Sequence, residues 1–476
     1  MENHCLNYQL SIINYVSAIS MKKETIIGIL VILLGTVAAC RKARVDDTLP
    51  NIIVILADDL GYGDLSCYGA TRWQTPHIDR LAQEGILFDN YHSASTVCSP
   101  TRAALLSGRT PYSIGMPGVV RSDTADSWGY LFPDVPLLPA YLKNKGYQTA
   151  LIGKWHLGLA APNLPGLKGF DYFAGFLSDK VDDYYTHLRG NVNYLRLNEL
   201  TVQPKGHLTD IYVNWALDYI NRIATPEKPF FMYWAHNAPH NPVQPPPDFV
   251  ESYRKKHPEQ QDTVVIKYGA FIEHLDDAIG RVLDGMNAAR FGRPTLVVFT
   301  SDNGGNLSVG AYNKWRSGKG TFYEGGLRVP CIVAGLPDQK GKIVRNDLIT
   351  TIDIVPTILE LVNYPNRETL AMDGSSFLPV LRNSQAGDMG KNRALFWYWL
   401  EGGDKFGSGN TIEAWREGNY MLLKPEPNAK YELYDLVKDS LQRNNLADID
   451  TERYNSMKAA IEMQIKAAKQ VPFRKP

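Results

Sequence analysis

Short apolar runs that end in acidic or amide residues recur along this chain, and they restrict it to a layered α/β fold. NIIVILADD, at residues 51–59, is a β-branched run that is followed directly by two aspartates. Such a run is typical of a strand buried on both faces of a parallel sheet. RPTLVVFTSDNGG, at residues 293–305, repeats the pattern. Strands of this kind need helices on both faces of the sheet.

Helical segments alternate with these runs, as that requirement demands. TPHIDRLAQEG starts with Thr-Pro and stops at a glycine, which are usual helix boundaries. The alternation predicts an α/β domain with a large mixed, mostly parallel sheet flanked by helices. We expect helices in segments 75–84, 138–145, 270–286 and 350–362, and strands in segments 51–57, 149–153, 228–236 and 293–301.

The pattern changes after about Leu381, where short strand-like runs and turns replace the long alternation. The closing stretch 452–468 has helical periodicity. We therefore predict a catalytic domain over 48–382 and a smaller C-terminal α+β subdomain over 383–476, made of antiparallel strands and a helix.

The N-terminus carries the layout of an export signal. Lys22 and Lys23 precede an apolar run from Ile26, which ends in small residues at Cys40. VAAC resembles a bacterial lipobox, so residues 1–40 are interpreted as a signal and the mature chain is expected to start near a lipidated Cys40. That places the protein outside the cytoplasm, in the cell envelope, and bound to a membrane only through the lipid. An uncleaved membrane anchor is the alternative.

The chain has 50 basic and 50 acidic residues, so it has no general attraction to nucleic acid, and no nucleic-acid partner is expected. Of its five cysteines, Cys5 and Cys40 lie in the N-terminal segment. Three remain, so at least one thiol is unpaired or modified. Cys67 and Cys331 are interpreted as ordinary buried thiols, whereas Cys98 stands at the expected start of a helix, in TVCSPTRAALLSGR.

Acidic and amide residues follow two of the predicted strands. Asp58 and Asp59 close the first strand, and Asp302 and Asn303 close the strand near 300. Ligands of open α/β sheets collect at the carboxyl ends of the strands. Four such side chains form a hard oxygen-donor set, which suits calcium or magnesium and not zinc. Each pair could instead be a helix cap or a turn.

Basic residues follow the strands at the same edge. GKWHLG contributes Lys154 and His156, APHNP contributes His240, and GKGTFYEGG contributes Lys319. Each of these alone is an ordinary solvated loop residue. Together with a cation they converge on an anion with tetrahedral oxygens, which suits sulfuryl or phosphoryl transfer.

The motifs resemble those of the formylglycine-dependent sulfatases, which have an alkaline-phosphatase-like fold. CSPTRAALLSGR matches the C-x-P-x-R signature. The chain also contains, in family order, VILADDLGYGD, TPHIDRLAQEG, GKWHLG, FTSDNGG, GKGTFYEGGLRVP and YELYDLVKDSLQRNNLA. The resemblance spans about residues 51–447 and is strongest to arylsulfatases and N-acetylgalactosamine-6-sulfatases. It implies that a maturation enzyme oxidises Cys98 to formylglycine (3-oxoalanine), with Pro100 and Arg102 as part of the recognised motif.

The resemblance also implies residue roles. One divalent cation, Ca²⁺ or else Mg²⁺, would be bound by Asp58, Asp59, Asp302, Asn303 and, through the sulfate, the modified Cys98. Arg102 would hold the hydrated aldehyde, Lys154 and Lys319 the sulfate oxygens. One hydroxyl of the hydrate would attack sulfur, His240 would protonate the leaving alcohol, and His156 would take the proton of the other hydroxyl as sulfate leaves. His236 is the alternative to His240, and His77, His92 and His274 are interpreted as structural.

The implied activity is hydrolysis of a sulfuric ester, with a sulfated carbohydrate as the expected substrate. The alternatives are a phosphodiesterase or phosphonate monoester hydrolase of the same superfamily and a non-catalytic, glycan-binding lipoprotein. Residues 178–191 and 396–406 are rich in aromatic and acidic side chains and are candidates for sugar recognition. A solvated loop and a core strand are their plainer interpretations.

Overall fold

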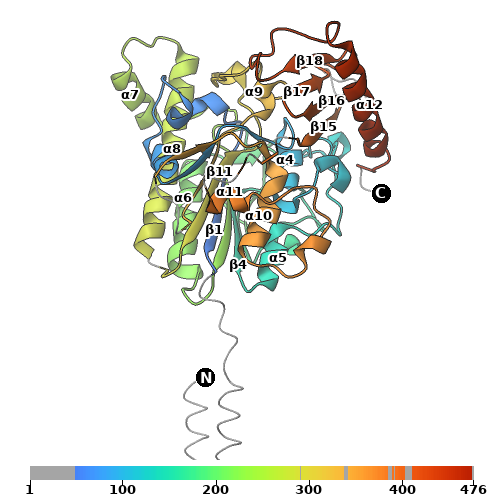
Figure 1. Cartoon of the computed structure of the whole chain (residues 1–476). Helices are drawn as coiled ribbons and strands as arrows, with labels where there is room; N and C mark the ends of the chain where they lie inside the picture. The colour runs from blue at the N-terminus through green and yellow to red at the C-terminus, as the bar shows by residue number, and fades with distance from the viewer. Residues whose placement is uncertain are drawn as a thin grey trace, which may run out of the picture. The chain divides into compact units, whose positions relative to one another are not determined.

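A computed structural model describes residues 49–289, 291–336, 341–383, 387, 389–390, 392–402 and 410–473. Its central feature is a mixed sheet that is parallel in its middle (Figure 1). The strands, in spatial order, are β13 (Ile343–Arg345), β2 (Gly85–Phe88), β12 (Cys331–Ala334), β11 (Thr295–Ser301), β1 (Asn51–Ala57), β10 (Phe230–Ala235), β4 (Gln148–Lys154), β5 (Tyr172–Phe176), β8 (Leu195–Leu197) and β9 (Leu200–Thr201).

The predicted strands form the centre of this sheet. β11, β1, β10, β4 and β5 run parallel, while β12 and β8 pair antiparallel with their neighbours. The predicted fold class is therefore confirmed. The sequence analysis missed the outer strands because runs such as GILF in β2 and CIVA in β12 are only four residues long.

Helices cover both faces of the sheet (Figure 1). α3, α6 and α8 share one apolar core with alternate residues of β1, including Ile53 and Ile55. α4, α5 and α10 pack on the other face. The helix bounds are α3 (Pro76–Gln83), α4 (Cys98–Ser107), α5 (Leu138–Asn144), α6 (Leu208–Asp218), α7 (Pro247–Lys256), α8 (Thr263–Ala289), α9 (Glu324–Leu327), α10 (Ile354–Leu361), α11 (Leu378–Arg382) and α12 (Thr451–Ala468).

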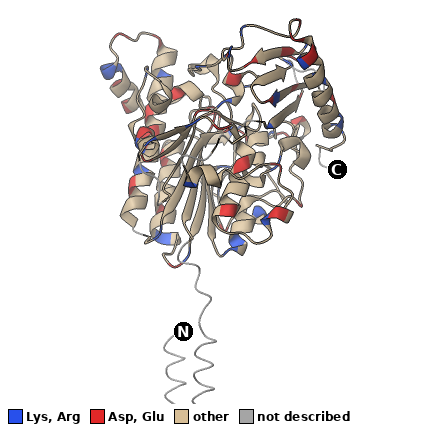
Figure 2. Cartoon of the chain, in the orientation of Figure 1, with Lys and Arg blue, Asp and Glu red and all other residues tan. Residues whose placement is uncertain are grey.

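Charged residues lie mainly on the helices and loops, and the strands of the central sheet are largely free of them (Figure 2). The strand residues from Ile52 to Leu56 are fully buried, as a parallel sheet covered on both faces requires. No helix of the described residues has both the length and the hydropathy of a membrane span.

A second, antiparallel sheet and α12 form the C-terminal part of the chain. Its strands are β15 (Ala394–Glu401), β16 (Asn410–Glu417), β17 (Tyr420–Leu423) and β18 (Glu432–Asp435). A buried polar contact joins it to the large sheet region: Arg416 of β16 lies 3.1 Å from His92, which pairs with Glu324 at 3.0 Å. Gln442 accepts the backbone N–H of Glu324. The C-terminal part therefore supports the segment that follows Lys319.

Candidate active site

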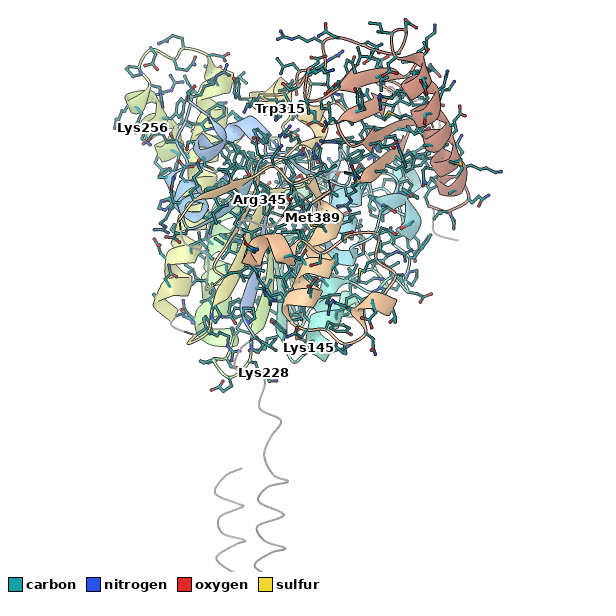
Figure 3. All side chains as sticks on the ribbon, in the orientation of Figure 1. Lys145, Lys228, Lys256, Trp315, Arg345 and Met389 are labelled. Atoms are coloured by element: carbon teal, nitrogen blue, oxygen red, sulfur yellow. The ribbon has the colours of Figure 1, made fainter. Side chains whose placement is uncertain are left out.

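The carboxyl ends of the central strands meet at one edge of the sheet. Lys145 and Lys228, which precede β4 and β10, lie at one end of the molecule, and Trp315 lies at the other (Figure 3). β1 pairs with β11 up to Ala57 and Ser301, so Asp58 and Asp302 follow side by side. The backbone N–H of Asp59 donates to Asp302 at 3.1 Å.

Close approach of β4 to β10 brings Lys154 to the same edge. Gly153 has φ 107°, and a Cβ there would stand 1.8 Å from the carbonyl oxygen of Ala235. Only glycine permits this approach. The Lys154 Nζ reaches Asp58 at 2.6 Å, and both side chains are fully buried.

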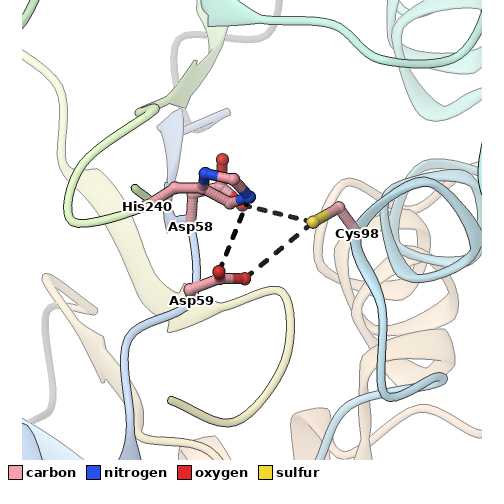
Figure 4. A group of neighbouring side chains, drawn as sticks. All are labelled: Asp58, Asp59, Cys98 and His240. Carbon is pink, nitrogen blue, oxygen red and sulfur yellow. Dashed lines mark hydrogen bonds and ion pairs between the residues drawn. The ribbon is translucent and has the colours of Figure 1, made fainter. Parts of the chain in front are cut away.

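Cys98 is the first residue of α4, and its sulfur lies among these charged groups (Figure 4). The Sγ atom is 3.3 Å from Asp58, 4.0 Å from Asp59 and 3.5 Å from the Nζ of Lys319. Burial, and secondly Asp302, raises the pKa of the Cys98 thiol well above its usual value. A thiol held neutral in this way is a poor nucleophile, so unmodified Cys98 is not suited to attack a substrate.

Three cations balance the three carboxylates of the site. Arg102, one turn along α4 from Cys98, binds Asp302 at 2.7 Å through Nη2. The Nζ of Lys319 binds Asp59 at 2.6 Å. Burial raises the pKa of Asp58, but the opposing effect of Lys154, with His240 and Arg102, lowers it to about 2. Asp58 is therefore ionised at neutral pH.

The donor set fits the predicted divalent cation. The Oδ1 atom of Asn303 is buried and has no hydrogen-bond partner among the described residues. Its Nδ2 atom donates to Asp59 at 2.8 Å, so the amide group lies beside this carboxylate. Burying an amide oxygen that accepts no hydrogen bond costs free energy unless a cation binds it. This oxygen and the carboxylates of Asp58, Asp59 and Asp302 form the hard-donor set that calcium and magnesium prefer.

The two predicted catalytic histidines bind backbone carbonyl oxygens through different ring nitrogens. The Nε2 atom of His156 lies 2.7 Å from the carbonyl oxygen of Val120, which can only accept, so Nε2 carries the proton. Its Nδ1 atom is buried without a partner among the described residues. In His240 the order is reversed, because Nδ1 donates to the Asn241 carbonyl at 2.7 Å and Nε2 lies 3.6 Å from Asp59.

His236, the alternative to His240, points into the protein. Its ring is fully buried and packs against Trp234, with 4.4 Å between the ring centroids. Neither ring nitrogen has a hydrogen-bond partner among the described residues. Of the two histidines, only His240 stands beside the carboxylates and Cys98 (Figure 4).

The structure adds residues that the sequence analysis did not single out. Thr96 accepts the backbone N–H groups of Gly320 and Thr321, which ties the Cys98 segment to the Lys319 segment. Ser99 accepts the N–H of Val120, the residue whose carbonyl orients His156. Such links join residues far apart in the sequence, so nothing in the local sequence pattern indicates them.

Tyr184 links the candidate recognition loop 178–191 to the site. Its hydroxyl donates to the carbonyl oxygens of Asn237, at 2.7 Å, and of His240, at 3.0 Å. In the same loop, Arg189 holds Asp179 at 2.9 Å. The loop therefore supports the turn that carries His240.

The other residues that the sequence analysis singled out lie away from the site or outside the described residues. Trp397 and Trp399 belong to the buried core of the C-terminal sheet, so the described part of 396–406 is a core strand, and residues 403–409 lie outside the described residues. Cys67 and Cys331 are free thiols, but only Cys331 is fully buried. Cys40 and the signal segment also lie outside the described residues.

The chain is similar to known proteins over most of its length. A profile of the Sulfatase family matches residues 50–364, and one of the N-sulphoglucosamine sulphohydrolase C-terminal region matches residues 314–471. N-acetylgalactosamine-6-sulfatase of Homo sapiens is 32% identical over 396 residues, which cover 76% of this chain and 74% of the relative. Arylsulfatase A of Homo sapiens is 32% identical over 376 residues, or 73% and 70% of the two chains. The crystal structure of Ps i-CgsB in complex with k-i-k-neocarrahexaose has a TM-score of 0.79 at 26% identity, covering 90% of this chain and 94% of that chain.

Burial of neutral His236 predicts a specific acid sensitivity. Burial lowers the pKa of His236 to about 3. The unfolded chain takes up a proton below about pH 6.5, while the folded chain does not until about pH 3, so stability falls as pH drops through this window. When the pH is lowered from about 7.5 to about 5, the free energy of unfolding should fall in both proteins. The fall should be about 2 kcal/mol smaller in His236→Asn than in the wild type. Urea unfolding at both pH values measures this, with the partly exposed His257→Asn as control. Equal losses in wild type and His236→Asn would contradict the prediction.

Proposed function

Because this chain belongs to the sulfatase family and is a sulfatase enzyme, we propose that it releases inorganic sulfate from sulfated carbohydrates with a formylglycine made from Cys98 and one divalent cation. The observation that carries the proposal is the position of the Cys98 sulfur, between Asp58 and the Nζ of Lys319. The same position as an aldehyde hydrate would supply an oxygen nucleophile for sulfur and a second hydroxyl that drives sulfate release.

The cation and the basic side chains have separate tasks. Asp58, Asp59, Asp302 and Asn303 would hold the cation, which supplies positive charge toward the sulfate oxygens when it is bound. Lys154 and Lys319 orient the sulfate and offset its negative charge. Burial lowers the pKa of Lys319, but Asp59 and the other nearby anionic groups have a larger, opposite effect. The net result is a raised pKa, so the ammonium group stays charged.

His156 has the properties of a base. Burial, and secondly Lys154, lowers the pKa of His156 well below its usual range, so the ring is neutral at neutral pH. Its Nε2 proton is held by Val120, which leaves the Nδ1 lone pair to accept a proton from the hydroxyl beside it. The pairing with Val120 thus sets which nitrogen acts.

His240 has the position of the acid on the leaving-group side. Its side chain is 10% exposed, more than the fully buried Lys154, and its Nε2 atom faces the site. Burial lowers the pKa of His240, and Asp59 opposes that effect. An anionic sulfate ester would add to the effect of Asp59 and favour the protonated ring, which then delivers its Nε2 proton to the departing oxygen.

A carbohydrate is the substrate class that the relatives favour. One relative is named for N-acetylgalactosamine 6-sulfate, and the structural neighbour holds k-i-k-neocarrahexaose. In this chain, loop 178–191 lies against the His240 turn and presents Asp179 and Arg189, which are 14% and 27% exposed. We assign sugar recognition to this loop, since charged groups at the edge of the site can bind ring hydroxyls.

The modification of Cys98 is the first test. We expect protein coexpressed with a formylglycine-generating enzyme to give a Cys98 peptide that has lost sulfur and two hydrogens and gained one oxygen. The same protein should hydrolyse an aryl sulfate faster than a phosphate diester, and Cys98→Ala should lose at least about a thousandfold in kcat. Peptide mass spectrometry and the two assays measure this. An unmodified thiol in active protein, or preference for the diester, would overturn the proposal, the second in favour of a phosphodiesterase.

Removal of the cation is the second test. EDTA treatment should abolish activity, and calcium or magnesium should restore it. Asn303→Ala removes the buried amide oxygen and should raise the calcium concentration for half-maximal activity by about tenfold or more. Asn303→Asp, which keeps an oxygen ligand, should be less affected, and the exposed Asn287→Ala is the control. Full activity after complete chelation would contradict a role for the cation.

Export and lipid anchoring form the third part of the proposal, supported by Lys22, Lys23 and the VAAC sequence ending at Cys40. We expect labelled palmitate to enter the full-length protein in a bacterial host. Cys40→Ser should remove the label without changing the specific activity. Label that persists in Cys40→Ser would show that Cys40 is not the acceptor.

A further inference from the structure

A second group of metal-ligating side chains lies outside the active site. His207 precedes α6, Asp210 is in the first turn of α6, and His274 is on α8. One ligand atom from each residue lies within 4.8 Å of the others. None of the three belongs to the Cys98 cluster. The sequence analysis interpreted His274 as structural and did not consider the other two.

His274 is the member with unused bonding capacity. Its side chain is 1% exposed, and its Nε2 atom lies 3.3 Å from the Oδ2 of Asp210. Neither Nε2 nor Nδ1 has a hydrogen-bond partner among the described residues, so the approach to Asp210 is a charge contact without a hydrogen bond. Buried imidazole nitrogens are normally satisfied, so an unpartnered ring aimed at a carboxylate and a second histidine indicates a missing ligand.

His207 has the support that metal-binding histidines usually have. Its Nε2 atom donates to the carbonyl oxygen of Gln244 at 3.0 Å, which fixes the tautomer and leaves the lone pair on Nδ1. That lone pair now accepts the N–H of Thr209 at 3.2 Å, a helix-capping bond. Binding an ion would replace this one hydrogen bond with a much stronger coordinate bond.

Asp210 completes the set and opens it to solvent. Its Oδ1 atom accepts from Arg281 at 2.8 Å, so its charge is partly compensated and the Oδ2 atom faces His274. The side chain is 35% exposed, which allows water to supply a fourth ligand. Two imidazoles, one carboxylate and one water form a set that zinc takes readily.

We propose that His207, Asp210 and His274 form a second metal site, selective for zinc and similar nitrogen-preferring ions over calcium. The two sites differ in donor chemistry: oxygen atoms predominate in the active site, which also has Cys98 and His240, whereas this one offers two imidazole nitrogens and one carboxylate. A bound ion would tie α6 to α8. It would also steady Tyr184, whose ring stacks on His207 with 5.0 Å between centroids and whose hydroxyl holds the carbonyl of His240.

Cobalt titration tests the site without relying on catalysis. Full-length, tag-free protein is stripped of metal, saturated with calcium and titrated with Co²⁺, which absorbs visible light when bound to nitrogen ligands. We expect one equivalent of Co²⁺ to bind, and Zn²⁺ to displace it. His274→Asn and Asp210→Asn should each weaken binding by about tenfold or more, while His257→Asn should not change it.

Thermal unfolding provides the second measurement and guards against misfolded variants. Zn²⁺ should raise the Tm of the wild type and of His257→Asn, but not that of Asp210→Asn, whose partly exposed side chain makes the change tolerable. No binding of Co²⁺ or Zn²⁺ to the wild type, or binding by the two cluster variants that is as tight as in the wild type, would overturn the proposal and leave an ion-paired histidine network. Both measurements are made in a Cys98→Ala background, since the thiol of the active-site cluster could itself bind Co²⁺ or Zn²⁺. The result is then independent of conversion of Cys98, and the proposed sulfatase mechanism is tested separately.

Discussion

Mutual neutralisation of six charges at the carboxyl edge of the sheet, all buried except the partly exposed Lys319, is the interaction on which the site depends. Each carboxylate has a cationic partner within 3 Å, and the pairs are Asp58 with Lys154, Asp59 with Lys319, and Asp302 with Arg102. Burial of an unpaired charge costs several kcal/mol, so no member of this set can be removed alone without a large penalty. With the charges balanced, a bound divalent cation leaves the site with a net positive charge, which suits an anionic sulfate ester.

Long-range backbone links hold these charges in place. Thr96 joins the segment before Cys98 to the segment after Lys319, and Ser99 joins α4 to the loop that orients His156. The C-terminal sheet adds support through Arg416, His92 and Glu324. The groups that we propose to be catalytic therefore lie on several elements that support one another, which keeps their positions defined before substrate arrives.

The strand ends were predictable because buried parallel strands have a strong local signal. NIIVILADD and TLVVFTSDN show both the strand and the acidic residues behind it, and sheet topology requires such ends to meet. The antiparallel neighbours β2 and β12 were not predictable, since four apolar residues fit a strand or a buried helix turn equally well. Likewise, two histidines stand four residues apart in WAHNAPH, and no periodicity distinguishes the buried His236 from His240 at the site.

The sequence by itself determined the fold class, the family resemblance and the set of residues at the strand ends. Each of these depends on short motifs whose residues are close together in the chain. Tertiary structure decided which atoms of those residues are available for the proposed chemistry. The carbonyl of Val120 selects Nδ1 of His156, the carbonyl of Asn241 selects Nε2 of His240, and the packing of α6 on α8 brings His207 to His274. Apart from the bond between the adjacent residues His240 and Asn241, these contacts join segments distant in sequence, so they exist only once the chain has folded.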